Sequence, residues 1–134
     1  MKLPVSAWVA MGSLLGSLSR YSLQLVIGIP EADQLPWATL AANILGSLII
    51  GWVAGLQLPV HHWLSELKRR QFLMTGFCGG FTTFSIFGLQ TLQLMEAGEW
   101  MLVMLNVGAT SSLMMVAVAL GYALALYQNN RTNG

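Results

Sequence analysis

Charged residues are scarce in this chain, and their scarcity is the first guide to its class. Only 8% of the 134 residues are charged and 55% are hydrophobic, whereas a soluble domain carries about 25% charged residues. The single cysteine, Cys78, excludes an internal disulfide. A net charge of +1, without a basic stripe to neutralise phosphates, predicts no nucleic-acid partner. Composition therefore favours a protein embedded in membrane lipid.

Long runs without Asp, Glu, Lys or Arg divide the chain into candidate membrane spans. Residues 37–60, 71–95 and 100–130 are uncharged, and each run exceeds the roughly 20 residues that a helix needs to cross the hydrocarbon layer. A fourth candidate is interrupted only by Arg20. We therefore predict one all-α membrane domain over residues 1–134, with four transmembrane helices at about 3–29, 37–58, 71–95 and 100–127.

Basic residues lie on one side of this predicted topology. With four spans, the two termini and the second loop share a side, and the loops of the other side contain no Lys or Arg. The positive-inside rule therefore predicts cytoplasmic termini. The basic residues of that side are Lys2, Lys68, Arg69, Arg70 and Arg131.

Small residues recur at helical spacing in the first two spans. Gly12 and Gly16 lie one turn apart in the first span, and Gly46, Gly51 and Gly55 lie in the second. Such faces let helix backbones approach closely inside a membrane. The pattern predicts that both spans pack tightly against neighbouring helices.

Polar side chains inside a span are costly and are therefore functional candidates. Arg20 fits two interpretations equally well: a side chain that reaches the interface from the helix end, or an anion-attracting group at a pore mouth. Asn43 also fits two, because its amide can join helices or donate to a ligand. Asn106 and Thr110 lie one turn apart in the fourth span and predict a short polar track.

The third span holds the most unusual segment of the chain. Gly76, Gly79 and Gly80 fall within five residues and precede two β-branched threonines, a combination that disfavours a continuous helix. We expect a broken turn near 79–83, at the middle of the membrane. Irregular backbone at that depth must be buried or must line a cavity, and its freed carbonyls suit a small hard cation. Phe84 and Phe87 follow, three residues apart.

The whole chain resembles the Fluc (CrcB) fluoride channels. The similarity rests on weak motifs in the first and fourth spans, a highly specific one in the third, and a further match in the second. These are Gly12-x-x-x-Gly16-x-x-x-Arg20-Tyr21, Thr39-Leu40-Ala41-Ala42-Asn43-x-x-Gly46, Gly76-Phe77-Cys78-Gly79-Gly80-Phe81-Thr82-Thr83-Phe84-Ser85 and Asn106-Val107.

The resemblance implies an antiparallel, dual-topology dimer of four-helix subunits in a bacterial plasma membrane (the inner membrane if the cell is Gram-negative). Two narrow pores would export cytoplasmic fluoride passively and protect the cell from its toxicity. Backbone carbonyls of Gly79 and Thr82 from both subunits would hold one structural sodium ion, Na+, at the dimer centre. Membrane lipid and a second copy of the chain are the other implied partners.

The resemblance also assigns pore residues. Phe84 and Phe87 would present electropositive ring edges to fluoride, Asn43 would donate an amide hydrogen bond, and Arg20 would lie at the vestibule. Further pore candidates are Ser85, Asn106 and Thr110.

Two features depart from the family pattern. Ile86 stands where the family usually has threonine, which removes one hydroxyl near the pore. The basic residues are divided five to none between the two sides, whereas a dual-topology homodimer needs nearly unbiased loops. Either the bias is overridden during assembly, or the chain pairs with an oppositely oriented paralogue.

Other functions fit the sequence less well. A small proton-coupled multidrug exporter needs a membrane-embedded carboxylate, and every Asp and Glu of this chain lies outside the predicted spans. A non-transporting scaffold explains the glycine faces but not the third-span segment. An enzyme is the least favoured class, because Cys78 has no histidine within any span and His61 and His62 lack an evident third ligand.

Overall fold

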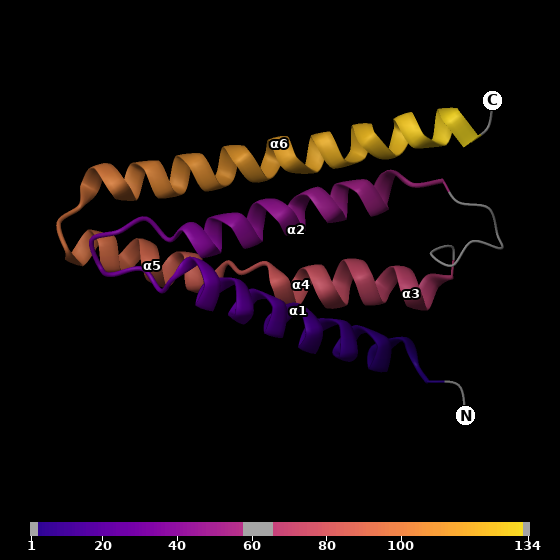
Figure 1. Cartoon of the computed structure of the whole chain (residues 1–134), viewed down its shortest axis with the longest axis horizontal. Coiled ribbons are helices and arrows are strands. Elements are labelled where there is room, and N and C mark those ends of the chain that lie inside the picture. Colours follow the sequence, from indigo (N-terminus) through magenta and orange to yellow (C-terminus); the bar gives the residue numbers. More distant parts are fainter. Residues whose placement is uncertain (1–2, 58–65, 133–134) are drawn as a thin grey trace.

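The computed structural model describes residues 3–57 and 66–132, and in these ranges the chain forms four helical rods (Figure 1). The third rod is made of several consecutive helical segments. The elements are α1 (Val5–Ile27), α2 (Trp37–Gly55), α3 (Leu67–Gln71), η2 (Phe72–Cys78), α4 (Gly79–Phe81), α5 (Ser85–Glu96) and α6 (Trp100–Thr132). The beginning of α1 and the end of α6 lie at the same end of the bundle (Figure 1).

Three of the rods have the length and hydropathy of membrane spans within the described part of the chain. They are Trp37–Gly55, Leu67–Glu96 and Trp100–Arg131. The first rod, α1, has 23 residues and is long enough to cross a bilayer. However, its serines and Arg20 lower its hydropathy, and it does not join that set. The helical class is confirmed, and the predicted second loop lies partly in 58–65, outside the described residues.

The first rod packs against the first half of the third rod through glycine backbones. A Cβ added to Gly12 would lie 2.8 Å from Phe77 N, and one added to Gly76 would lie 2.7 Å from Val9 O. Both distances are too short for a real side chain, so the backbones touch where glycine permits it. The predicted packing role of Gly12 is confirmed.

Among pairs of single helical elements in the described part of the chain, α2 and α6 make the largest contact. A Cβ at Gly51 would lie 2.9 Å from the carbonyl carbon of Val118, and one at Gly121 would lie 2.8 Å from Trp52 N. Gly55 faces α6 as well, at 2.8 Å from the Ala125 methyl group. Gly51 and Gly55 of the predicted glycine face therefore contact α6, whereas Gly46 faces the side chains of Thr82 and Phe81 on the third rod.

Side chains from later in the sequence cap the end of α2. Arg70 Nη2 donates to the carbonyls of Val53 and Ala54, both at 3.1 Å. Asn129 Nδ2 donates to Gly55 O at 2.9 Å, and its Oδ1 accepts from Gln57 N at 3.1 Å. The last carbonyls of a helix have no partner within it, and these groups supply donors for them.

The third rod departs from α-helical geometry at two places along its length. η2 is a seven-residue π-helix, which the sequence pattern did not predict, and α4 follows it directly. Helical structure then ends at Phe81, Thr82 is extended with φ −78° and ψ 157°, and α5 begins at Ser85.

The glycines of the third rod are themselves helical, which corrects one part of the sequence interpretation. Gly76 lies in η2, and Gly79 and Gly80 lie in α4. Gly76 and Gly80 are four residues apart and both face α1; a Cβ added to Gly80 would lie 2.9 Å from Ser13 Cα. They are packing glycines, and the non-helical residues are 82–84.

A tight turn joins α5 to α6. Gly98 has a φ of 77°, a left-handed conformation that glycine adopts without steric cost. Gly98 N donates to Met95 O at 3.0 Å, and Glu99 N donates to Leu94 O at 2.9 Å. The turn lays α6 back along α5 and α2.

Candidate functional site

A cavity of about 390 Å³ lies where the interruption of the third rod faces α2 and α6. We call it the Phe84 cavity. Five of the predicted site residues line it, although they come from different segments of the chain: Asn43, Thr82, Phe84, Phe87 and Thr110. Its lining is Asn43, Thr82, Thr83, Phe84, Phe87, Thr110, Ser111, Met114 and Met115.

Asn43 holds the interrupted backbone in place. Its Oδ1 accepts a hydrogen bond from Thr83 N at 2.8 Å, and its Nδ2 donates to Thr83 O at 3.1 Å. The side chain is only 2% exposed, so this pairing satisfies polar groups that would otherwise be costly in an apolar interior. Asn43 therefore joins α2 to the third rod, and the second hydrogen of its NH₂ group remains for a ligand.

The same contact leaves the Gly79 carbonyl without its usual donor. In a continuous α-helix the N–H of Thr83 would donate to Gly79 O, but here it donates to Asn43. Thr82 N and Thr82 Oγ1 both donate to Cys78 O, at 2.9 and 2.8 Å. Gly79 is exposed, and a Cβ at this position would meet nothing within 4 Å.

Thr83 begins the second half of the rod. Its Oγ1 accepts a hydrogen bond from Ile86 N at 3.2 Å and lies 3.3 Å from Ser85 Oγ. Thr83 precedes the N-cap residue Phe84, and its hydroxyl gives an acceptor to an N–H of the first turn, which has no partner within the helix. The pattern at 79–83 predicts a broken turn but not this hydrogen bond, although a threonine just before a helical segment is a known capping signal.

Two phenylalanine rings border the Phe84 cavity. The ring centroids of Phe84 and Phe87 are 5.9 Å apart and the ring planes are inclined by 40°. Phe84 is 83% exposed, an unusual state for a large apolar side chain next to a buried amide. Both rings and Asn43 line the same cavity.

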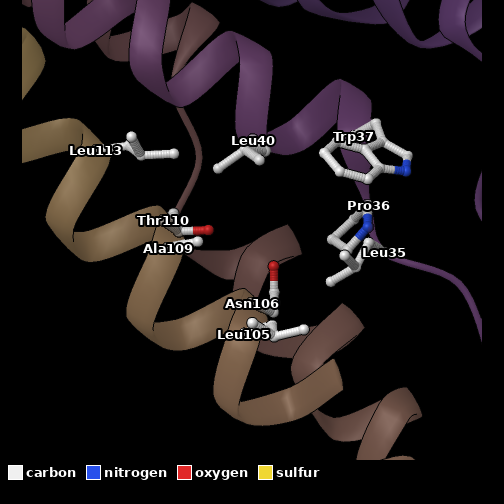
Figure 2. A pocket seen from close by; sticks show the side chains of 9 residues that line it. All are labelled: Leu35, Pro36, Trp37, Leu40, Leu105, Asn106, Ala109, Thr110 and Leu113. Carbon is white, nitrogen blue, oxygen red and sulfur yellow. The ribbon is translucent and has the colours of Figure 1, made fainter. Parts of the chain in front are cut away.

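A second cavity of about 290 Å³ lies between the start of α2 and the first turns of α6 (Figure 2). We call it the Trp37 cavity. Asn106 and Thr110 are its polar residues and both are buried. Its lining is Leu35, Pro36, Trp37, Leu40, Leu105, Asn106, Ala109, Thr110 and Leu113. Thr110 lines both cavities, so the predicted polar track connects them.

Other predicted site residues lie outside the Phe84 cavity. Asn106 belongs to the Trp37 cavity, whereas Arg20, Gly79 and Ser85 line neither one. The Nε atom of Arg20 is buried and has no hydrogen-bond partner among the described residues. Sequence reasoning assigned no site role to Met115, which lines the Phe84 cavity and carries no polar signal that could have revealed it.

Comparison with known proteins assigns the family. The family model described as CrcB-like protein, Camphor Resistance (CrcB), matches residues 7–122. The chain belongs to the CrcB-like family. The resemblance drawn from the sequence motifs is thereby confirmed.

Members of the CrcB-like family from several bacteria are similar over nearly their whole length. The fluoride-specific ion channel FluC of Paramagnetospirillum magneticum (strain ATCC 700264 / AMB-1) is 44% identical, over 92% of this chain and 96% of the relative. FluC 1 of Rhodopseudomonas palustris (strain BisB18) is 39% identical, over 92% and 87%. FluC of Opitutus terrae (strain DSM 11246 / JCM 15787 / PB90-1) is 42% identical, over 92% and 93%.

These relatives agree with the general class expected from the sequence. Their names are those of ion channels and not of enzymes, so the expectation of a non-enzymatic protein is confirmed. Together with three rods of spanning length among the described residues, they identify a multi-pass membrane protein.

Proposed function

We propose that this chain is a fluoride-selective channel that passively exports fluoride from the cytoplasm. The observation that carries the proposal is the Phe84 cavity, where Asn43, Phe84, Phe87 and Thr110 converge. The CrcB-like family and its relatives, named as fluoride-specific channels, support the same conclusion.

The chemistry of the cavity suits a small, strongly hydrated anion. Fluoride gives up its water only where compact donors and positive charge density replace it at close range. Asn43 has an N–H left to donate after its contacts with Thr83, and aromatic ring edges are electropositive. Phe84 and Phe87 would supply those edges, and the hydroxyl of Thr110 would supply a further donor.

Passive export needs no energy source other than the membrane potential. Hydrogen fluoride crosses lipid uncharged and dissociates in the more neutral cytoplasm. A negative interior then drives the anion outward with about 2.3 kcal/mol per charge per 100 mV. A selective open path is therefore enough to protect the cell.

We further propose that α1 is a fourth span and that the working unit is an antiparallel dimer. α1 packs along the third rod and its 23 residues suffice to cross a bilayer. The Phe84 cavity is open in one chain, and the exposure of Phe84 supports a second subunit opposite it. On this proposal, the interruption at 82–84 lies at the middle of the membrane.

The residues near the interruption fit a sodium ion. A hard monovalent cation prefers oxygen ligands. Thr83 N donates to Asn43 Oδ1 and so leaves Gly79 O without the donor that it would have in a continuous helix. The carbonyls of Gly79 and Thr82, given by both subunits, would hold the ion at the dimer centre. Bound there, the cation would compensate freed carbonyls at a depth where lipid offers no donors.

The proposed partner is a second copy of the chain, and the bias of the basic residues makes an oppositely oriented paralogue the alternative. Crosslinking of singly tagged copies distinguishes the two. If all termini face the cytoplasm in cells that express this chain alone and export fluoride, the antiparallel homodimer is wrong.

Vesicle efflux tests the proposed function directly. Purified protein in liposomes, with the potential clamped by an ionophore, should release fluoride and retain chloride. Equal efflux of both ions would refute the selectivity. Proton-coupled export of a cationic drug, measured in the same vesicles, would favour the exporter alternative instead.

A further inference from the structure

One end of the bundle carries only negative charge in its turns, and we call it the acidic end. It holds the connection from α1 to α2 and the turn from α5 to α6 (Figure 1). Residues 28–36 and 96–100 contain no Lys or Arg, and Arg20 lies within α1 rather than in these turns. The acidic residues there are all exposed: Glu31, Asp33, Glu96 and Glu99.

The opposite end is positive, and we call it the basic end. It holds the start of the third rod and the end of α6 (Figure 1). Arg70 caps the last carbonyls of α2, and Arg69 Nε lies 3.2 Å from Glu66 Oε2 in an ion pair. The described charged residues of this end are Glu66, Lys68, Arg69, Arg70 and Arg131. Cations therefore outnumber anions there.

The charges of the two ends cannot neutralise one another within one chain. α6 joins the two ends and has 33 residues, which corresponds to a length of about 50 Å. Salt screens exposed charges beyond about 8 Å at physiological ionic strength. Lys68, Glu96 and Glu99 also form no ion pair within the described part of the chain. Protein groups of opposite charge must therefore come from another chain.

The register of the third rod brings unlike ends together in an antiparallel pair. Thr82 lies at the middle of Leu67–Glu96, and Lys68 and Glu96 are equally many residues before and after it. The axis of the proposed dimer passes the interruption at 82–84. Two third rods that cross there in opposite directions place Lys68 at the level of Glu96 of the partner subunit. A parallel pair would place like charges together at both ends.

We propose that a second copy of this chain is selected by charge, because the acidic end of each subunit meets the basic end of its partner. The inference rests on the antiparallel dimer of the proposed function and names the contacts that favour it. A dimer has two such junctions. One exposed ion pair contributes little, but several charges act together at each junction.

The same charges make an oppositely biased paralogue the poorer partner. By the positive-inside rule, the basic loops of such a paralogue would lie in the cytoplasm. They would then be beside the basic end of this chain, and like charges would meet. The bias of the basic residues counts against two orientations during insertion, yet it favours self-pairing once oppositely oriented copies meet.

Charge reversal tests the pairing in detergent, where membrane insertion plays no part. One variant carries Glu96→Lys with Glu99→Lys, and the other carries Lys68→Glu with Arg69→Glu. Either variant paired with itself has like charges at both junctions, whereas a mixed dimer has opposite charges at both. After the differently tagged variants are dissociated and mixed, the ratio of mixed to self-paired dimers should exceed the random ratio about tenfold at low salt.

Salt and neutral variants are the controls for this mixing experiment. The excess of mixed dimers should vanish at 1 M salt, where the screening length is about 3 Å. Variants with Gln at the same four positions should pair at random at every salt concentration. Random pairing of the charge-reversed variants at low salt, or an excess that 1 M salt leaves unchanged, would overturn the proposal.

Crosslinking of the parent sequence locates the junction without altering its charges. Leu67→Cys and Ala97→Cys are exposed positions next to the charged residues, and Cys78→Ala removes the native thiol. A bismaleimide should join position 67 of one subunit to position 97 of the other. Links between two copies of position 97 would mean that like ends meet, and they would overturn the proposal.

Fluoride efflux from vesicles separates this inference from the proposed function. Charge-dependent pairing in a parent protein that releases no fluoride would refute the proposed function and leave the pairing in place. Random pairing of the charge-reversed variants, together with fluoride release by the parent protein, would refute the pairing alone. A parent protein that stays monomeric would overturn both the dimer and the pairing.

Discussion

The two halves of the third rod are held in the fold by different kinds of contact. The first half, α3 to α4, is fixed against α1 by backbone contacts at Gly76 and Gly80. The second half, α5, packs mainly on α6, and a Cβ added to its exposed Gly88 would meet nothing within 4 Å. Its start is held instead by hydrogen bonds that converge on Thr83. One half therefore depends on steric fit, and the other depends on polar contacts.

Because of this difference, one half of the rod stabilises the fold and the other half exposes side chains at the cavity. Glycine contacts between backbones leave no room for a ligand but need no polar atoms. Hydrogen bonds to Thr83 hold a short non-helical segment while leaving Phe84 free at the cavity. Substitutions in the two halves should consequently fail in different ways.

The largest effect is expected from the exposed ring. Phe84→Ile should reduce fluoride efflux to the leak of empty vesicles, because an aliphatic side chain has no electropositive edge. The fold should survive, since the side chain is 83% exposed. Liposome efflux and gel filtration of the same preparation measure the two properties. Unchanged flux would show that the Phe84 ring has no role in ion passage, and that the second half of the rod is not specialised for function.

Glycine substitutions test whether backbone contacts hold the first half of the third rod against α1. Gly80→Ala would bring a methyl group within 2.9 Å of Ser13 Cα, and backbone atoms cannot swing away, so we expect a loss of about 3 kcal/mol. Gly88→Ala should instead gain up to about 1 kcal/mol from helix propensity. Thermal unfolding in detergent compares them. Equal melting temperatures would mean that the first half is not held by backbone fit.

A smaller loss is expected at the contact between α2 and the interruption. Asn43→Ala removes both hydrogen bonds to Thr83 and should destabilise the fold by about 2 kcal/mol. Ser111→Ala, also at the cavity wall, is the control and should change little. If the two variants unfold at the same temperature, Asn43 does not hold the interruption.

The smallest effect concerns the cap of α5. Thr83→Val keeps the shape but loses the acceptor for Ile86 N, at a cost of about 1 kcal/mol. Amide hydrogen exchange should accelerate in the first turn of α5 and not in α4, and Thr83→Ser should restore protection. Faster exchange in both segments would show that the halves are not independent.

Much of the helical fold followed from the sequence because its signals are local. Uncharged runs gave rods close to the predicted ranges, and the one-turn spacing of Gly12 and Gly16 correctly indicated a close helix contact. Gly76 and Gly80 are also four residues apart and therefore fit the same pattern of a helix contact, but the adjacent pair Gly79 and Gly80 is typical of a broken helix. These glycines were therefore interpreted as helix breakers although they pack against α1.

The site was harder to predict because its parts meet across long stretches of sequence. Motif resemblance supplied Asn43 and Phe84 as pore residues, yet only the fold shows that the Asn43 amide pairs with the backbone of Thr83. The π-helical geometry of η2 and the unpaired hydroxyl of Thr110 arise from packing against other rods. No local propensity encodes such features.

The cap of α2 has a consequence for the order of synthesis. When Gly55 leaves the ribosome, the side chains that will bond to the last carbonyls of α2 have not been made. Arg70 arrives about fifteen residues later, and Asn129 follows Gly55 by 74 residues. A nascent chain halted before the last turns of α6 therefore carries α2 with a carbonyl, that of Gly55, whose later donor has not yet been made.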